Sequence, residues 1–323
     1  MRLAPALLAV VMGGAVAAAS PTAYDGQRAA LAQAALQHTF FDGKQGLYRD
    51  VAGRPAIADA WPYSQALAAT IALAQVPHAG RRYVRVARAR IAALARYARG
   101  DGARRIFRVV TGAWDSDPSH PCAGGVFWTT VAGNHDRNTV TTATGALLAM
   151  RLYGATHASG YLVWARRMLA WAEQCMASPN GLLWDHIDLR GRVDRTEWSY
   201  NQGTAIGAYV LLYRLVGDRT ALARAEELAD ASLRYFDENR LRAEPPFFLA
   251  IFFRNLLSLG QAAHDPRCRA AAQAYADGVW TDRRDPRTGL VAFHAGAPAR
   301  LLEQSALVQL YAALAQPHSV PGA

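Results

Sequence analysis

The sequence predicts an all-α protein, and three observations support this fold class. Apolar residues recur every three or four positions along almost the whole chain, which is the spacing of a helix face. Strand-like alternation is rare, and the connections carry Gly, Pro and Asp, as in Asp42-Gly43 and Asp285-Pro286. The chain has 323 residues, 52% of them hydrophobic, which excludes a disordered protein and a disulfide-stapled mini-protein.

The helical periodicity defines ten long segments and one short one. The long helices are expected at 24–38, 60–75, 81–99, 138–153, 160–178, 201–216, 219–236, 247–260, 265–281 and 303–316, and the short one at 103–110. A sequence pattern repeats at 152–162, 212–222 and 259–268. In each copy an apolar helix ends in Leu-Tyr or Leu-Gly, and a turn and a new helix follow. This repeat predicts stacked helical hairpins, either an open solenoid or a closed (α/α) toroid.

The first 19 residues read as a signal peptide. Arg2 is a short positive region, Leu3 to Val16 is apolar, and Ala17-Ala18-Ala19 fits a cleavage site, with an uncleaved anchor as the alternative. We therefore expect one domain over 20–323, secreted or associated with the cell envelope. Export permits disulfides, and of the three cysteines we expect Cys122 to pair with Cys175.

The formal charge of +10 comes almost entirely from arginine, because the chain has a single lysine, Lys44. The arginines are interpreted as scattered, with many beside Asp or Glu, which argues against nucleic-acid binding. No stretch after the signal peptide is apolar enough to span a membrane, because Arg or polar residues interrupt each run.

Several loops before helix starts combine large aromatics with carboxylates and amides, which is the chemistry of a sugar site. Aromatic faces pack on the C–H patches of a pyranose, and carboxylates and amides bind its hydroxyls. The aromatic candidates are Trp61, Tyr63, Phe127, Trp128, Trp184, Trp198 and Tyr200. The polar candidates are Asp136, Asn138, Asp185, Asp188, Asn201 and Gln202. The alternative is that the aromatics are core residues and that the polar residues cap helices; 136–139 in particular suits a cap.

No metal or organic cofactor is expected. The spacing of the cysteines does not suit zinc, and no HExxH, GxSxG, Walker or GxGxxG pattern occurs in its proper context. His120, His135 and His186 are isolated in the sequence, which is more typical of structural histidines.

Taken together, these strings resemble glycoside hydrolase family 76. The matching strings run in order from about Tyr24 to the C-terminus, and the most specific are the Gly-Gly-x-x-Trp loop at 124–128 and Trp-Ser-Tyr-Asn-Gln-Gly at 198–203. The resemblance implies an (α/α)6 toroid with a cleft at one end, and a retaining endo-α-1,6-mannanase. It also implies two adjacent aspartates at a helix start, one as nucleophile and one as general acid/base.

The adjacent aspartates are absent, because the sequence contains no Asp-Asp dipeptide. In the family pattern their helix falls between 81–99 and Gly112, where this chain has only residues 100–110. We therefore expect a toroid that is incomplete by about one helix and a half. The acidic residues nearest the gap, Asp115 and Asp117, are the remaining catalytic candidates.

Three interpretations follow: a protein that binds mannan without cleaving it, an enzyme with a substitute acidic pair, or a recorded sequence that lacks a segment. A substitute pair is disfavoured, because nucleophile and acid must both be repositioned. The sequence thus predicts a monomer that binds an α-1,6-linked mannan-type glycan with weak or absent hydrolysis. A helical scaffold for protein partners is the alternative, and it predicts an exposed apolar surface where the helix is missing.

Overall fold

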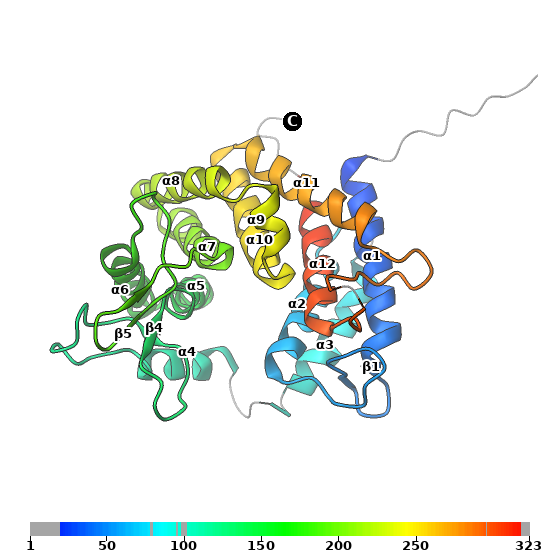
Figure 1. The fold of residues 1–323 in the computed structure, drawn as a ribbon, viewed down its shortest axis with the longest axis horizontal. Coiled ribbons are helices and arrows are strands. Elements are labelled where there is room, and N and C mark those ends of the chain that lie inside the picture. The colour runs from blue at the N-terminus through cyan, green and yellow to red at the C-terminus, as the bar shows by residue number, and fades with distance from the viewer. Residues whose placement is uncertain (1–19, 78–79, 95, 98–101, 295, 318–323) are drawn as a thin grey trace, which may run out of the picture.

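The computed structural model describes residues 20–77, 80–94, 96–97, 102–294 and 296–317. The predicted signal peptide lies outside these residues, as does most of the stretch that joins residues 94 and 102. Helices dominate the described part of the chain and form two layers around a ring (Figure 1). The predicted all-α class is confirmed.

The inner layer contains five long helices, each packed on the next. In ring order they are α2 (Ala60–Ala74), α12 (Leu301–Leu314), α10 (Pro246–Ala263), α7 (Ser199–Val216) and α5 (Thr139–Thr156). The outer helices are α1 (Pro21–Phe40), α3 (Arg81–Leu94), α6 (Ser159–Met176), α8 (Arg219–Tyr235) and α11 (Pro266–Asp282). Outer helices α3, α6, α8 and α11 each pack on the inner helix that precedes them in the chain, which makes helical hairpins, and α1 packs on α12.

The ring is interrupted between α2 and α5, as Figure 1 shows at its lower edge. Between α3 and α5 the chain forms one further helix, α4 (Gly102–Gly112), which packs on α5. The interruption coincides with the place where the sequence has too few residues for the family pattern. Helix α3 ends at Leu94, earlier than the predicted residue 99, and residues 96–97 form a turn.

Short strands and one short helix were not predicted. The helix is α9 (Glu238–Ala243). Strands β1 (Phe41–Asp42) and β2 (Leu47–Tyr48) form a hairpin, and an antiparallel sheet has the order β3 (Val126–Phe127), β4 (Asp136–Asn138), β5 (His186–Asp188), β6 (Val193–Asp194). The interpretation of 136–139 as a helix cap is therefore wrong in part: Asp136–Asn138 is a strand, and α5 begins at Thr139 without a side-chain cap.

Helix boundaries follow local chemistry. Asp218 and Asp265 accept hydrogen bonds from backbone N–H groups in the first turns of α8 and α11, which satisfies donors that have no partner within the helix. Inner helices α5, α7 and α10 end at left-handed residues, His157, Gly217 and His264, whose N–H groups bond back to the last turn. These helix ends lie within the repeated sequence pattern, so the prediction of stacked hairpins is confirmed.

Helices α7 and α10 of the inner ring approach each other closely. A Cβ atom on Gly203 would lie 2.5 Å from the Cα of Phe252, which leaves no room for any side chain. The expectation that no stretch after the signal peptide is apolar enough to span a membrane is wrong for α10, which meets that criterion by length and composition alone, although half of that stretch is buried. Helix α10 packs between α7, α11 and α12, as a core helix does.

The loop between α4 and β3 is held by a disulfide and a close glycine contact. Cys122 is bonded to Cys175 of α6, which confirms the predicted pairing, and Cys268 is the buried free thiol. Gly124 and Gly125 have φ values of +111° and +80°, and a Cβ on either would lie within 2.7 Å of the Trp171 ring. Only glycine satisfies both conditions.

The Arg137 side chain, fully buried on β4, joins this loop to the sheet. Its guanidinium donates to Asp115 Oδ2 at 2.9 Å, to the carbonyls of Cys122 and Pro121 at 3.0 Å, and to the Asp188 carbonyl at 2.8 Å. The loop, the disulfide and strands β4 and β5 thus meet at one charged group. Burial lowers the pKa of Arg137, and the charge of Asp115 opposes that shift.

Replacing Gly203 with Ala should destabilise the fold, because the new methyl group would force α7 and α10 apart. We expect a loss of about 1–3 kcal/mol in the free energy of unfolding, measured by urea denaturation. Gly160→Ala is the matched control, since Gly160 is helical with nothing within 4 Å of its added Cβ. That control should be neutral or stabilising by up to about 1 kcal/mol; equal losses in both variants would contradict the close approach.

Replacing Arg137 with Met should cost about 3–5 kcal/mol, because Asp115 would remain buried without its cation. The control is Arg192→Met, which removes the ion pair of a largely exposed arginine with Asp188 and should cost less than about 1 kcal/mol. The double variant Arg137→Met/Asp115→Asn should recover part of the loss. If it recovers nothing, the carbonyl contacts and not the ion pair stabilise the loop.

Candidate functional site

The inner helices begin at one end of the ring, where side-chain and backbone contacts connect their first turns to one another and to a nearby loop. The Trp61 ring on α2 lies 5.4 Å from the Phe247 ring on α10. Phe248, also on α10, stacks on Tyr200 of α7 with ring centres 3.9 Å apart. The first N–H of α5, on Thr139, donates to the carbonyl of Asp185 at 2.8 Å. This end therefore collects residues from α2, α5, α7 and α10.

Aromatic rings form a continuous row across this end. Trp61 is exposed, Phe247 and Phe248 are half-buried, and Trp198 lies 5.5 Å from Phe248. The Phe247 and Phe248 rings are 5.0 Å apart and nearly perpendicular. Exposed and half-buried ring faces at a helix-start surface can pack on apolar patches of a ligand.

A polar cluster lies beside this row, centred on the buried Asp185. Its Oδ1 accepts from Asn201 Nδ2 at 3.2 Å, and its Oδ2 is 2.9 Å from His186 Nδ1. Burial, then the negative charges of Asp185 and Glu244, raises the pKa of Tyr200. Tyr200 therefore stays neutral between two carboxyl groups and can act as a hydrogen-bond donor.

Two amide oxygens of the cluster can still accept hydrogen bonds. Asn138 Oδ1 and Asn201 Oδ1 are buried and accept no hydrogen bond from the described residues. A buried acceptor without a partner costs free energy that a ligand donor or an ordered water would recover. Asn138 is paired with His186 across β4 and β5, so both amides border the same polar cluster.

Three side chains here could also hold a cation. One ligand atom from each of Asp185, His186 and Asp194 lies within 4.8 Å of the others. Asp194 already accepts hydrogen bonds from the N–H and hydroxyl of Thr196, which lower its pKa. Within the trio, Asp185 is bonded to His186, while Asp194 is bonded to Thr196.

Three of the predicted site residues have structural roles. Tyr63 is fully buried between α2 and α3, donates to the Arg90 carbonyl at 2.8 Å, and has a pKa raised to about 12 by burial. Gln202 is fully buried and bonds both backbone groups of Leu183. Asp188 caps a turn, and hydrogen bonds, the largest from the Arg192 N–H, lower its pKa to about 2.

The remaining predicted residues lie on the four-stranded sheet and its loops. Phe127 is half-buried on β3, and the exposed Trp128 donates its N–H to the carbonyl of Asp136 at 2.9 Å. The Asp136 carboxylate lies 3.9 Å from His186 Nε2. Trp184 is half-buried, with the Arg195 guanidinium 5.3 Å from its ring. These residues border the polar cluster through His186 and Asp185.

Asp115 and Asp117 lie in the loop that Arg137 holds. Asp115 is buried and is bound by Arg137 and by His120 Nδ1 at 3.0 Å, so its carboxylate is occupied within the protein. Asp117 is half-exposed and accepts from the N–H and hydroxyl of Ser119, which lower its pKa. Their contacts give both groups structural roles, and their catalytic assignment stays a prediction.

Two carboxyl groups, the half-buried Glu244 and the buried Glu303, were missed by the sequence analysis. Glu244 and Glu303 line a cavity of about 210 Å³ at the starts of α10 and α12, next to Phe247. Glu244 accepts from the N–H and hydroxyl of Ser199, but burial outweighs these bonds and raises its pKa to about 7. Burial also raises the pKa of Glu303, against the positive charges of His294 and Arg300. The only sequence signal was an acidic residue close to the start of an apolar helix.

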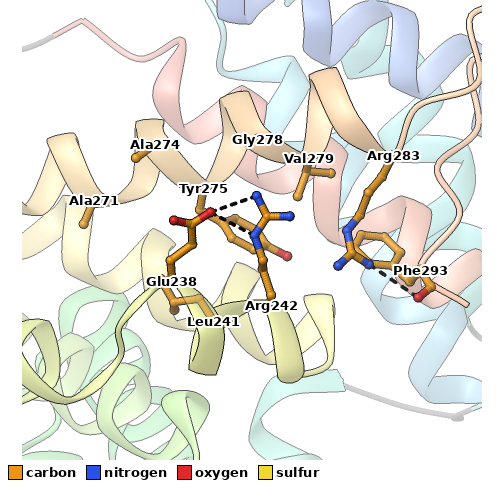
Figure 2. Close-up of a pocket in the computed structure, with 10 residues that line it drawn as sticks. All are labelled: Glu238, Leu241, Arg242, Ala271, Ala274, Tyr275, Gly278, Val279, Arg283 and Phe293. Atoms are coloured by element: carbon orange, nitrogen blue, oxygen red, sulfur yellow. Dashed lines mark hydrogen bonds and ion pairs between the residues drawn. The ribbon is translucent and has the colours of Figure 1, made fainter.

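A larger cavity, of about 310 Å³, opens between α9 and α11 (Figure 2). Arg242, Arg283 and Phe293 line both cavities. Figure 2 shows Arg242 paired with Glu238, and Arg283 directed to the Phe293 carbonyl. The guanidinium groups of Arg242 and Arg283, which line both cavities, are therefore already bonded to protein atoms.

Comparison with known sequences gives a consistent family match. The model named glycosyl hydrolase family 76 matches residues 100–247. The mannan endo-1,6-alpha-mannosidase DCW1 of Candida glabrata is 26% identical over 145 residues, 42% of this chain and 32% of that protein. DFG5 of Candida albicans, with the same enzyme description, is 28% identical over 151 residues, 43% of this chain and 33% of that protein. The matches thus span about a third of the length of these curated relatives.

Solved structures share the fold across most of the chain. An inactive variant of the α-1,6-mannanase of Salegentibacter sp. HEL1_6 superposes with a TM-score of 0.79 at 17% identity, covering 90% of this chain and 99% of that one. A family 76 glycoside hydrolase from a bovine Bacteroides thetaiotaomicron strain gives 0.75 at 20% identity, covering 90% and 77%. The fold, the family match and the curated relatives together make the chain similar to members of glycoside hydrolase family 76.

Proposed function

We propose that this protein binds α-1,6-linked mannan-type glycans at the end of the ring where the inner helices begin, and that it hydrolyses them weakly or not at all. The observation that carries the proposal is the aromatic row beside a buried polar cluster with two amide oxygens that lack partners. Sugars need both features, because one face of a pyranose is apolar and its edge carries hydroxyls.

The prediction of weak hydrolysis follows from the carboxyl groups. A retaining reaction needs two carboxyls about 5–5.5 Å apart on either side of the scissile bond. This sequence has no adjacent aspartates, and the ring is interrupted where the family pattern would place them. In the Salegentibacter relative, a variant with two aspartates replaced is described as inactive and was crystallised with α-1,6-mannotriose. Binding and cleavage are thus separable in a protein of this fold.

The proposed glycan ligand also has a consequence for the location of the protein. The N-terminal pattern and the Cys122–Cys175 disulfide both suit an exported, single-domain protein, since disulfides persist in oxidising compartments. We propose a monomer that is secreted or held in the cell envelope, where mannan-type glycans would be accessible to it.

Binding should be measured by calorimetric titration with linear α-1,6-mannooligosaccharides. Replacing Trp61 with Ala should weaken affinity about five- to tenfold, because an exposed ring at the start of α2 is lost. Tyr24→Ala is the control, since Tyr24 is an exposed aromatic on outer helix α1. An unchanged affinity in the Trp61 variant, or no binding by the parent chain, would contradict the proposed surface.

Hydrolysis is tested separately, by incubation with linear α-1,6-mannan and chromatography of released oligosaccharides. We expect no products at rates ordinary for such enzymes, because the nucleophile and acid are not paired. Turnover at such rates would overturn the weak-hydrolysis claim and leave the binding claim to the titration.

Stability should depend on the protonation of Glu244. Its folded pKa of about 7 exceeds the ordinary glutamate pKa of 4.5, so the folded state holds a proton that the unfolded state releases between these pH values. The free energy of unfolding should therefore fall as pH rises from about 4.5 to about 7, by at most about 3 kcal/mol from this group. Glu244→Gln should flatten this fall, as measured by urea denaturation across that range. A slope identical to the parent's would show that Glu244 is ionised throughout.

A further inference from the structure

The excess positive charge of the chain is concentrated beside the interruption in the ring. Residues 81–112 contain ten arginines and one acidic residue, a net charge of +9, against +10 for the whole chain. The interpretation that the arginines are scattered is therefore wrong for this segment. The segment contains α3 and α4, which lie on the two sides of the interruption in Figure 1.

Helix α3 exposes a stripe in which arginines alternate with branched apolar side chains. The stripe consists of Arg81, Val84, Arg85, Arg88 and Ile91, spaced so that all five lie on one face of the helix. All five are exposed, including 40% of Val84 and 52% of Ile91. A solvated helix face would carry polar residues at these two positions.

The charges of the stripe are available, unlike that of Arg90 on the opposite face. Arg90 donates to the Tyr48 hydroxyl at 3.2 Å and lies 3.5 Å from the Phe41 ring, so it fixes α3 to the β1–β2 hairpin. No carboxylate among the described residues pairs with the three arginines of the stripe. Their positive field is therefore uncompensated at short range.

Helix α4 repeats the combination in a shorter form. Ile106 and Val109, three residues apart, are 50% and 55% exposed, while Phe107 packs inward against the Tyr161 ring. Arg104 is exposed next to them, and α4, like α3, contains no acidic residue. Both helices beside the interruption thus expose apolar side chains next to arginines.

Basic and apolar side chains on the same face select one kind of occupant. A second copy of this chain would bring like charges together at this surface, which costs free energy. A soluble polyanion would use the arginines and leave Val84 and Ile91 in water. An anionic bilayer uses both, because phosphates attract the arginines and the boundary of the acyl region takes up apolar side chains.

We propose that the α3 stripe, with the exposed face of α4, docks the protein on the surface of an anionic lipid bilayer. The arginines pair with headgroup phosphates, and Val84 and Ile91 enter the boundary between headgroups and acyl chains. The contact is peripheral and requires no membrane-spanning segment. It does not depend on glycan binding at the other surface, so the two proposals can fail independently.

The test is sedimentation with lipid vesicles, using the chain from Ser20 onward so that the apolar N-terminal segment does not contribute. Vesicles of phosphatidylcholine mixed with phosphatidylglycerol are compared with vesicles of phosphatidylcholine alone, at low and high salt. We expect partitioning to the anionic vesicles at low salt, a decrease at high salt, and little partitioning to the neutral vesicles. No partitioning to the anionic vesicles would overturn the proposal.

Charge variants separate the stripe from the net charge of the protein. Arg81→Gln/Arg85→Gln/Arg88→Gln should lower the partition coefficient on the order of a hundredfold, at roughly fivefold for each arginine. The matched control Arg54→Gln/Arg219→Gln/Arg234→Gln removes the same charge from exposed arginines elsewhere and should lower it less than about tenfold. Equal losses in both triple variants would overturn docking through α3.

Apolar variants separate a bilayer from a soluble polyanion. Val84→Ser/Ile91→Ser keeps every charge and should lower partitioning at least about tenfold, because the two apolar side chains that enter the bilayer are lost. The control Val163→Ser/Leu215→Ser changes exposed apolar residues on α6 and α7 and should have no effect. Unchanged partitioning of the α3 variant would indicate binding by charge alone and overturn the bilayer proposal. Matching urea unfolding curves would confirm that all variants are folded.

Discussion

The buried guanidinium of Arg137 is the contact on which the candidate site depends. It binds the Asp115 carboxylate and two carbonyls of the loop between α4 and β3, together with the Asp188 carbonyl on β5, and it lies on the strand that leads directly into α5. The charge is costly to bury, and its partners together compensate that cost. His186 is on β5, the strand paired with β4, and Asp185 directly precedes it. The positions of both residues therefore depend on Arg137.

The site has two regions with different physical character. The region around Asp185 is a hydrogen-bonded network in which amide oxygens have spare capacity. The region around Glu244 and Glu303 is a small cavity in which burial raises the pKa of both carboxyl groups. Tyr200 lies between the two regions, and the negative charges of Asp185 and Glu244 both raise its pKa. A sugar bound along the aromatic row would lie between amide acceptors on one side and carboxyl groups of raised pKa on the other.

Much of the fold could be predicted from the sequence, because a repeat of apolar residues at helical spacing survives without tertiary information. The long helices and the hairpin repeat were available in this way. The strands β3 to β6 were not, because each has two or three residues and is stabilised by pairing across distant loops. The chemistry of Glu244 could not be predicted either, because its pKa comes from burial by loops that periodicity does not describe. Tyr63 has the residue type of a sugar contact, and only the packing of α3 shows that it lies in the core.

The packing of α12 has a consequence for how the chain folds. This last helix lies between α1 and α2 on one side and α10 on the other, and Gln309 donates to Gln65 across a separation of 244 residues. The first helices therefore have no inner-ring neighbour on that side until the end of the chain has been made. Contacts so distant in sequence form slowly, because a long loop must close first. A protein built in this way should complete its core only after synthesis, which is compatible with crossing a membrane before it folds.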